Sequence, residues 1–172
     1  MQYFVTGATG FIGKRLVKTL LQRRGATVYF LLRPESAGKV ADLLDYWGAN
    51  KTRAIPVYGD LTTKKLGVSS DDVKKLKGRI DHLYHLAAVY DLAADTESQV
   101  QVNIEGTRNA VEFAKAIDVA HLHHVSSIAA AGLYEGVFRE DMFDEAEGLD
   151  HPYFMTKHES EKIVRNESKV PW

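Results

Sequence analysis

The 172-residue chain has 22 basic and 23 acidic residues and is 45% hydrophobic, which is the composition of an ordinary globular domain. The balanced charge argues against nucleic acid or a membrane surface as a partner, and the absence of cysteine excludes disulfides and thiolate metal sites. Apolar runs shorter than the roughly 20 residues of a membrane-spanning helix, and no signal peptide after Met1, predict a cytoplasmic protein without a membrane span.

Short β-rich runs alternate along the chain with longer segments of helical periodicity. The expected strands are 3–6, 27–32, 53–57, 81–86 and 121–125. The expected helices are 10–24, 35–47, 70–76, 96–116 and 152–166, with a loop at 132–150. This alternation predicts an α/β fold of Rossmann type, a doubly wound parallel sheet with helices on both faces. We expect one domain over 1–172, truncated before the last strands, because 170–172 read as the start of a further strand.

The segment Thr6-Gly7-Ala8-Thr9-Gly10-Phe11-Ile12-Gly13 joins the first expected strand to the first expected helix. Its first glycine suits a tight turn, its second the approach of the backbone to a pyrophosphate at a helix N-terminus, and its third close packing of helix on strand. The flanking strand and helix are the context that a dinucleotide-binding loop requires. The predicted cofactor contacts in the loop are Gly7, Thr9, Gly10, Phe11, Ile12 and Gly13.

Arg33 follows the second expected strand, where an NAD-binding domain places a carboxylate for the ribose 2′-hydroxyl. A guanidinium instead offers charge-assisted donors to a 2′-phosphate, which favours NADPH as the cofactor, with Ser36 as a second donor. A solvated arginine at the strand end is the simpler alternative. The other predicted cofactor contacts are Asp60 and Leu61, near the adenine, the small residues Ala87 and Ala88, and Tyr153 and Lys157 of the last expected helix.

Tyr153 and Lys157 lie four residues apart on the last expected helix, so their side chains share one face. A neighbouring ammonium stabilises the phenolate and so helps a tyrosine to protonate a developing alkoxide, and the same lysine can hold the nicotinamide ribose. At the end of the fifth strand, Ser127 is expected to bind the substrate oxygen and Ser126 to cap the next turn. Asn103, a poor helix former inside the long helix, marks a kink, a proton-relay water or neither.

Two further clusters have ordinary interpretations. His121, His123 and His124 lie close together, but the alternation of a strand places His124 on the opposite face, so we predict no metal site. The acidic segment 135–150 is either a solvated connection or a lid over the nicotinamide whose apolar side chains contact the substrate.

The segments TGATGFIG, HLAAVYD, VNIEGT, HVSSIAAAG and YFMTK, in this order and spacing, resemble the extended branch of the short-chain dehydrogenase/reductase superfamily over the whole chain. HHVSSIAAAGLYEGVFREDMF and LDHPYFMTKHESEKIVR are similar to the N-terminal, aldehyde-reducing half of bacterial fatty acyl reductases. The resemblance implies NADPH-dependent reduction of a fatty aldehyde or acyl thioester, and a longer protein with a substrate-binding region. It also implies a homodimer or larger homo-oligomer. The catalytic residues that it implies are Ser127, Tyr153 and Lys157.

Two alternatives stay open at this point. Within the same fold, the chain could belong to a sugar-nucleotide epimerase or dehydratase, or to another carbonyl reductase of the extended branch. In a different class, a non-catalytic NADP-binding sensor or scaffold would use the glycine loop but would have no need of the three catalytic side chains together.

Overall fold

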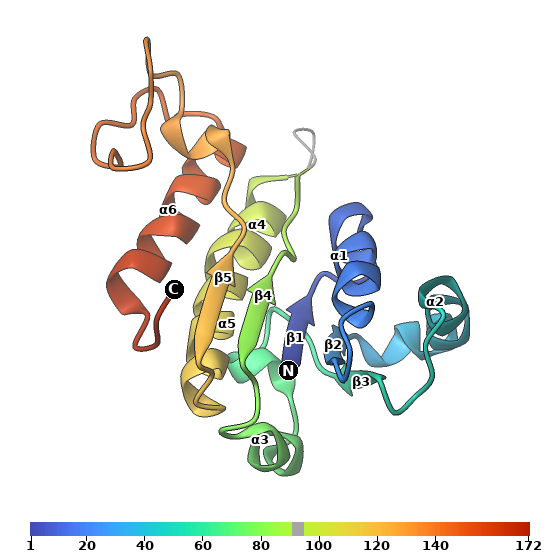
Figure 1. Ribbon diagram of the computed structural model, residues 1–172. Coiled ribbons are helices and arrows are strands. Elements are labelled where there is room, and N and C mark those ends of the chain that lie inside the picture. Colours follow the sequence, from blue (N-terminus) through green and yellow to red (C-terminus); the bar gives the residue numbers. More distant parts are fainter. Residues whose placement is uncertain (91–94) are drawn as a thin grey trace.

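A five-stranded sheet in the order β3-β2-β1-β4-β5 forms the centre of the computed structural model, which describes residues 1–90 and 95–172 (Figure 1). All four strand pairs are parallel, with Tyr3 of β1 opposite Val28 of β2 and His82 of β4. The predicted Rossmann-type parallel sheet is therefore confirmed. The strands are β1 (Gln2–Thr6), β2 (Thr27–Leu32), β3 (Ala54–Tyr58), β4 (His82–His85) and β5 (His121–His124).

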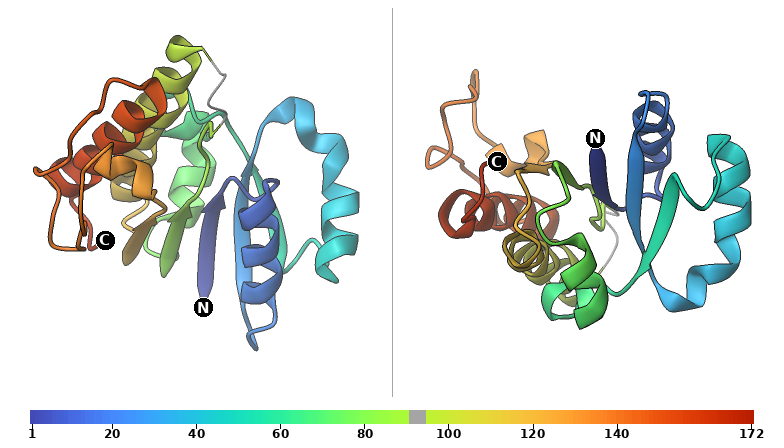
Figure 2. Two further views of the ribbon diagram at one scale, coloured as in Figure 1. Left: turned by 90° about the horizontal axis from the view of Figure 1, so that it is seen from above. Right: turned by 60° about the horizontal axis from the view of Figure 1, so that its bottom comes forward.

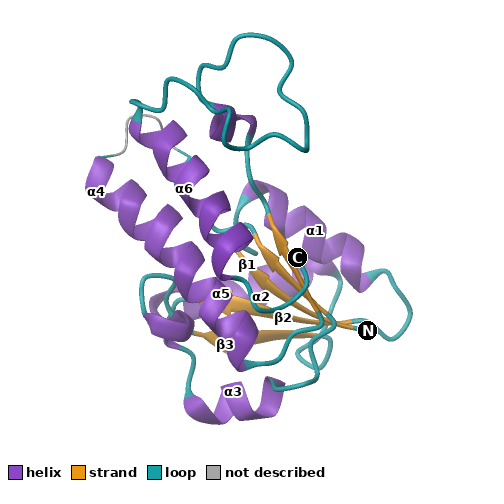
Figure 3. Ribbon diagram, turned by 90° about the vertical axis from the view of Figure 1, so that its left-hand side faces the viewer, coloured by secondary structure: helices purple, strands orange, loops and turns teal. Residues whose placement is uncertain are grey.

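Helices cover both faces of the sheet, as the views from above and from the side show (Figures 2 and 3). One face packs on α1 (Phe11–Leu21) and α2 (Val40–Trp47); the other packs on α3 (Ser70–Leu76), α5 (Gly106–Ala116) and α6 (Pro152–Glu167). The alternation of β1 serves both layers, because Tyr3 and Val5 enter the first core and Phe4 enters the second. Within residues 1–90 and 95–172, no helix has the length and apolarity to cross a membrane.

Several predicted helix boundaries were wrong. The first helix ends at Leu21 rather than at residue 24, because the next N–H groups bond three residues back and Gly25 turns the chain at a φ of +70°. The predicted helix 35–47 is divided into a 3-10 helix, η1 (Pro34–Lys39), and α2. The Ser36 N–H bonds the Arg33 carbonyl at 2.9 Å, which is the tighter 3-10 spacing.

The predicted long helix 96–116 has a π-helical segment in its middle. It consists of α4 (Thr96–Gln99), the π-helical segment η3 (Val100–Glu105) and α5. Such a segment bends a helix and is common near functional sites. Two 3-10 turns were not predicted, η2 (Lys64–Gly67) and η4 (Ile128–Ala131).

The last residues of the chain lie beside β5. The Leu122 N–H donates to the Pro171 carbonyl at 2.8 Å, although 170–172 form no strand. Segment 132–150 is irregular, as predicted, and extends from the end of the sheet that carries the carboxyl ends of the strands (Figure 1). That end of the sheet is where the candidate site lies.

Candidate active site

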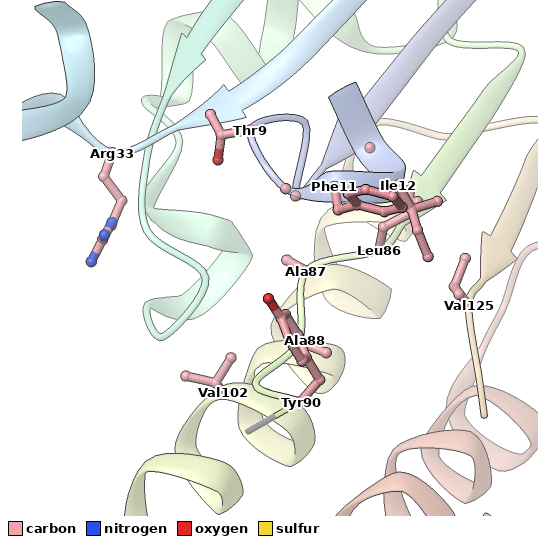
Figure 4. Close-up of a pocket in the computed structure, with 13 residues that line it drawn as sticks. Thr9, Phe11, Ile12, Arg33, Leu86, Ala87, Ala88, Tyr90, Val102 and Val125 are labelled. Atoms are coloured by element: carbon pink, nitrogen blue, oxygen red, sulfur yellow. The ribbon is translucent and has the colours of Figure 1, made fainter. Parts of the chain in front are cut away.

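A cleft opens where the carboxyl ends of β1 and β4 lie side by side. The chain leaves these two strands toward opposite edges of the sheet, and open α/β sheets bind ligands at such a point. Figure 4 shows the glycine loop on one side of the cleft and Tyr90 with Val102 on the other. The cleft has a volume of about 690 Å³, and it is lined by all six predicted residues of the glycine loop and by Arg33, Ala87 and Ala88.

A second hollow of about 260 Å³ adjoins the cleft and shares Arg33 with it. It is lined by the other predicted contacts, Ser36, Asp60 and Leu61. The Asp60 carboxylate accepts hydrogen bonds from the hydroxyl and the N–H of Thr62 at 2.6 and 2.7 Å, and these bonds lower its pKa. The structure therefore brings together every predicted cofactor residue apart from the tyrosine and lysine of the last helix.

The glycine loop leaves its backbone open to a ligand. Gly7 has a φ of +73°, and the Gly10 N–H donates to its carbonyl at 3.0 Å to close the turn. A Cβ on Gly13 would lie 2.1 Å from the same carbonyl oxygen, so only glycine lets α1 begin this close to the loop. With no side chain at these positions, the N–H groups at the start of α1 are accessible to an anionic pyrophosphate, which fits a dinucleotide.

Arg33 has charged neighbours in and beside the second hollow. Its Nε lies 3.3 Å from an Oε1 atom of Glu35, and both side chains are exposed, so the pair is weak. Lys39, which the sequence analysis did not select, lines the same hollow and adds a second positive charge. The hollow therefore offers two cations to an anion, with the carboxylates of Glu35 and Asp60 competing for Arg33.

Lys157 reaches the wall of the cleft from α6. Its side chain is buried, with 4% of the residue exposed, and its Nζ donates to the Val125 carbonyl at 3.0 Å. Val125 follows β5 and lines the cleft. Burial lowers the pKa of Lys157 to about 8, and the negative charge of Glu161 opposes this lowering. Tyr153 lies one turn earlier, in the first turn of α6, where its N–H donates to the capping His151 ring at 3.1 Å.

The prediction that Ser126 caps the turn after β5 was wrong, whereas the substrate-binding role of Ser127 stays a prediction. Ser127 caps η4, since its Oγ accepts the Ala129 N–H at 3.2 Å. Ser126, the predicted cap, instead donates its hydroxyl to Glu161 at 2.6 Å. Accepting one bond leaves the Ser127 hydroxyl hydrogen available for another acceptor.

Ser127 lines a separate hollow of about 240 Å³, whose wall includes Phe138, Met142 and Phe143 of the acidic segment. In the part of the chain that the structure describes, the Tyr153 hydroxyl makes no hydrogen bond with Ser127 or Lys157. Ser127, Tyr153 and Lys157 are thus not among the residues that line the cofactor cleft, and Lys157 reaches its wall through Val125. The lid role of the acidic segment stays a prediction.

Asn103 lies in the π-helical segment and is 1% exposed. Its amide is fully engaged: Oδ1 accepts the Val89 N–H at 2.8 Å, and Nδ2 donates to the Val89 carbonyl at 3.0 Å and to Thr156 Oγ1 at 3.2 Å. The helix is thus irregular at Asn103, and the proton-relay and catalytic roles of Asn103 stay predictions. The side chain ties the segment after β4 to the helix that carries Tyr153.

A chain of hydrogen bonds connects the end of β1 to Asn103. Thr6 Oγ1 accepts the N–H groups of residues 86 and 87 at 3.2 Å, so its hydrogen is directed to Nδ1 of His85 at 2.8 Å. The imidazole therefore carries its hydrogen on Nε2 and donates it to Thr107 Oγ1 at 3.1 Å. That hydroxyl donates to the Asn103 carbonyl at 2.7 Å. Burial lowers the pKa of His85 to about 3, which agrees with a neutral ring.

The stability of the fold is expected to fall as the pH is lowered below 6.5. His85 and His124 have pKa values of about 3 and about 2, lowered from 6.5 chiefly by burial, so the folded chain keeps them neutral while the unfolded chain protonates them. Each then removes roughly 1.4 kcal/mol of unfolding free energy per pH unit. Urea unfolding across this range measures the slope. Both His124 ring nitrogens lack a partner among the described residues, so His124→Leu should remove the His124 share of the pH dependence and leave that of His85. An unchanged slope would contradict the low pKa assigned to His124.

The other histidines of the strands, His82, His121 and His123, lie on the opposite face of the sheet from His85 and His124, as the alternation predicts. His123 Nε2 lies 2.9 Å from His82 Nδ1, and its ring stacks on Tyr84, whereas His124 stacks on His85. In the described ranges, no group of three or more histidine, cysteine or acidic side chains is arranged to hold a metal.

Sequence reasoning missed several residues of the site. Leu86, Tyr90, Val102 and Val125 line the cleft. Leu86 directly follows β4 and Val125 directly follows β5, at the sheet edge where the cofactor contacts were predicted. Their position after a strand could therefore have identified them. No local pattern marks the buried polar chain, because its members come from different strands and helices.

The sequence of the chain matches one family model and is similar to proteins of known name. Residues 5–172 match the sequence model of the NAD-binding family described as male sterility protein. A linear gramicidin synthase from Brevibacillus parabrevis is 33% identical over 173 residues, covering 93% of this chain and 3% of that protein. Fatty acyl-CoA reductase wat of Drosophila melanogaster is 28% identical over 142 residues, covering 74% of this chain and 28% of that protein.

Two solved structures share the fold. The terminal R domain from the myxalamid PKS-NRPS biosynthetic pathway is 29% identical with a TM-score of 0.83, covering 99% of this chain and 46% of that one. UDP-glucuronic acid 4-epimerase from Bacillus cereus in complex with NAD is 28% identical with a TM-score of 0.73, covering 99% and 55%. The chain thus spans between 3% and 55% of these four proteins. It belongs to the male sterility protein family of NAD-binding domains, within the extended branch of the short-chain dehydrogenases/reductases.

Proposed function

We propose that residues 1–172 form the cofactor-binding part of a longer cytoplasmic, homo-oligomeric reductase that uses NADPH to reduce a fatty aldehyde or acyl thioester. The observation that carries the proposal is the hydrogen bond from Lys157 to Val125, because it brings the Tyr153 helix to the wall of a cleft built around a dinucleotide loop. The partial coverage of the relatives and the similarity to a fatty acyl-CoA reductase support the length and the substrate class.

The chain's own residues would divide the reaction as follows. NADPH supplies the hydride that the carbonyl carbon receives. Tyr153 donates its phenolic proton to the carbonyl oxygen as negative charge develops there, so an aldehyde leaves as the alcohol. Lys157, largely protonated at neutral pH with its pKa of about 8, stabilises the phenolate that remains. Ser127 donates its free hydroxyl hydrogen to the same substrate oxygen and orients it.

Arg33 is assigned to the 2′-phosphate, and its loss is expected to affect NADPH alone. Arg33→Gln removes a charged donor worth roughly 1.5–3 kcal/mol, which weakens NADPH binding by about 10- to 100-fold and leaves NADH binding unchanged. Glu35→Gln should act in the opposite direction, since it frees Arg33 from its ion pair. Fluorescence titration of both cofactors into the chain measures the two constants. Equal losses for NADPH and NADH would refute the assignment.

Substrate profiling of the complete reductase tests the proposed chemistry. We expect NADPH oxidation with long-chain aldehydes or their CoA thioesters and none with nucleotide sugars. Turnover confined to nucleotide sugars would favour an epimerase-like or dehydratase-like activity. Tight NADPH binding with no turnover of any carbonyl compound would favour a sensor or scaffold. Sedimentation of the same protein checks the expected homo-oligomer.

A further inference from the structure

Three charged side chains form a row along α6. Lys157, Glu161 and Arg165 are each four residues apart, so they lie on one side of the helix. One Glu161 oxygen accepts two hydrogen bonds from Arg165, at 2.9 Å from Nε and 2.7 Å from Nη2. The other oxygen accepts the Ser126 hydroxyl at 2.6 Å. With 18% of its side chain exposed, Glu161 is held from two directions in a mostly buried position.

The same row holds the segment that leads to Ser127. Lys157 binds the carbonyl of Val125, and Glu161, one turn later, binds the hydroxyl of Ser126. Two consecutive residues of this segment are thus attached to two side chains of the helix that carries Tyr153. These two bonds fix the distance between the end of β5, which leads to Ser127, and α6, which carries Tyr153.

Aromatic side chains cover the outer end of the row. The Arg165 guanidinium lies 4.6 Å from the centre of the Phe143 ring and 5.7 Å from that of Trp172. Phe143 in turn stacks on His158 of α6 at 4.3 Å. With 30% and 18% of their side chains exposed, Arg165 and Glu161 form a pair whose charges are screened less than those of an open surface pair.

Glu161 is also the negative charge that faces Lys157. The titratable groups that interact with the ammonium are Glu161 on α6, His85 on β4 and His124 on β5, and Tyr153 lies one turn earlier on α6. Both histidines are neutral, with pKa values of about 3 and about 2. Among these groups in the described residues, Glu161 therefore supplies the negative charge at neutral pH.

We propose that Glu161 is a positioning residue for the Tyr153–Lys157 pair: it fixes the Ser126–Ser127 segment through its hydrogen bond and keeps Lys157 charged through its carboxylate, with Arg165 moderating that charge. This inference rests on the proposed function, because it assigns Glu161 to the same reaction.

The pH profile of kcat separates the electrostatic role from a merely structural one. Glu161→Gln retains an acceptor for Ser126 but removes the charge, so the pKa of Lys157 falls and the alkaline limb should move about one pH unit toward acid. Arg165→Gln removes the moderating charge and should move the limb in the opposite direction. Ser126→Ala breaks the hydrogen bond without changing any charge, so kcat should fall about tenfold with the limb unmoved.

A second measurement does not depend on activity. NMR titration of the Lys157 ammonium in the chain should give the same two opposite shifts in the folded variants, with folding checked by near-ultraviolet circular dichroism. If Glu161→Gln does not fold, the Arg165→Gln shift decides. If the wild type is active but neither Glu161→Gln nor Arg165→Gln moves the alkaline limb or the Lys157 titration, the proposed role of Glu161 is wrong. A wild type inactive on every carbonyl compound would instead overturn the proposed function.

Discussion

Tyr153→Phe is expected to lower kcat for carbonyl reduction by roughly 10²- to 10⁴-fold, the usual contribution of a positioned general acid. The substitution removes the proton that the carbonyl oxygen must receive and keeps the ring that packs 6.5 Å from Phe154, so the helix should stay intact. NADPH binding should change little, because the glycine loop and Arg33 are untouched. Steady-state kinetics of the complete reductase and NADPH titration of the chain measure the two effects.

The control for this variant is Tyr46→Phe. Tyr46 lies on α2, where its ring faces the Lys14 ammonium at 4.1 Å, and phenylalanine retains that ring. Its kinetics should equal those of the wild type. If the Tyr153 variant retained near-normal aldehyde reduction, the acid would have to be another group and the proposed mechanism would be wrong.

Gly13→Ala should abolish cofactor binding and lower the free energy of unfolding by about 3 kcal/mol. Its new methyl group would stand 2.1 Å from the Gly7 carbonyl oxygen and 2.8 Å from that carbonyl carbon, and both atoms belong to the backbone of the turn that the Gly10 N–H closes. The start of α1 would have to move away from the loop. That movement disperses the N–H groups that would bind the pyrophosphate.

Gly38→Ala is the matched control, since a Cβ there meets no atom within 4 Å and its φ is not in the left-handed region. Urea unfolding and NADPH titration of both variants give the comparison. A Gly13 variant as stable and as tightly bound to NADPH as the Gly38 variant would show that the loop tolerates the displacement.

The fold was predictable because each layer leaves a local pattern. The alternation of Tyr3, Phe4 and Val5 between two cores, and the apolar stripe of α1 that includes Val17 and Leu20, are visible in short windows of sequence. The residues that line the cleft and the adjoining hollow were predictable for a related reason. They directly follow strand ends, and in a parallel sheet these ends meet at one edge.

The arrangement of the predicted catalytic residues could not be predicted in this way. Whether Ser126 or Ser127 caps η4 depends on where Glu161 lies, 35 residues later on a different helix. The engagement of Asn103 depends on Val89 and on a π-helical segment that has no distinctive composition. Contacts between distant segments decide both, and neither propensity nor spacing contains that information.

The polar chain from Thr6 through His85 and Thr107 to Asn103 limits which substitutions a related protein can accept. Thr6, His85 and Thr107 each donate one hydrogen bond to the next member, so the direction of each bond depends on the bond before it. Serine at position 6 or 107 would preserve the sequence of donors. Valine at either position would leave a buried imidazole nitrogen without a counterpart, at a cost of roughly 1–3 kcal/mol. Homologues should therefore replace these positions jointly, with an apolar side chain at 85 wherever both hydroxyls are lost.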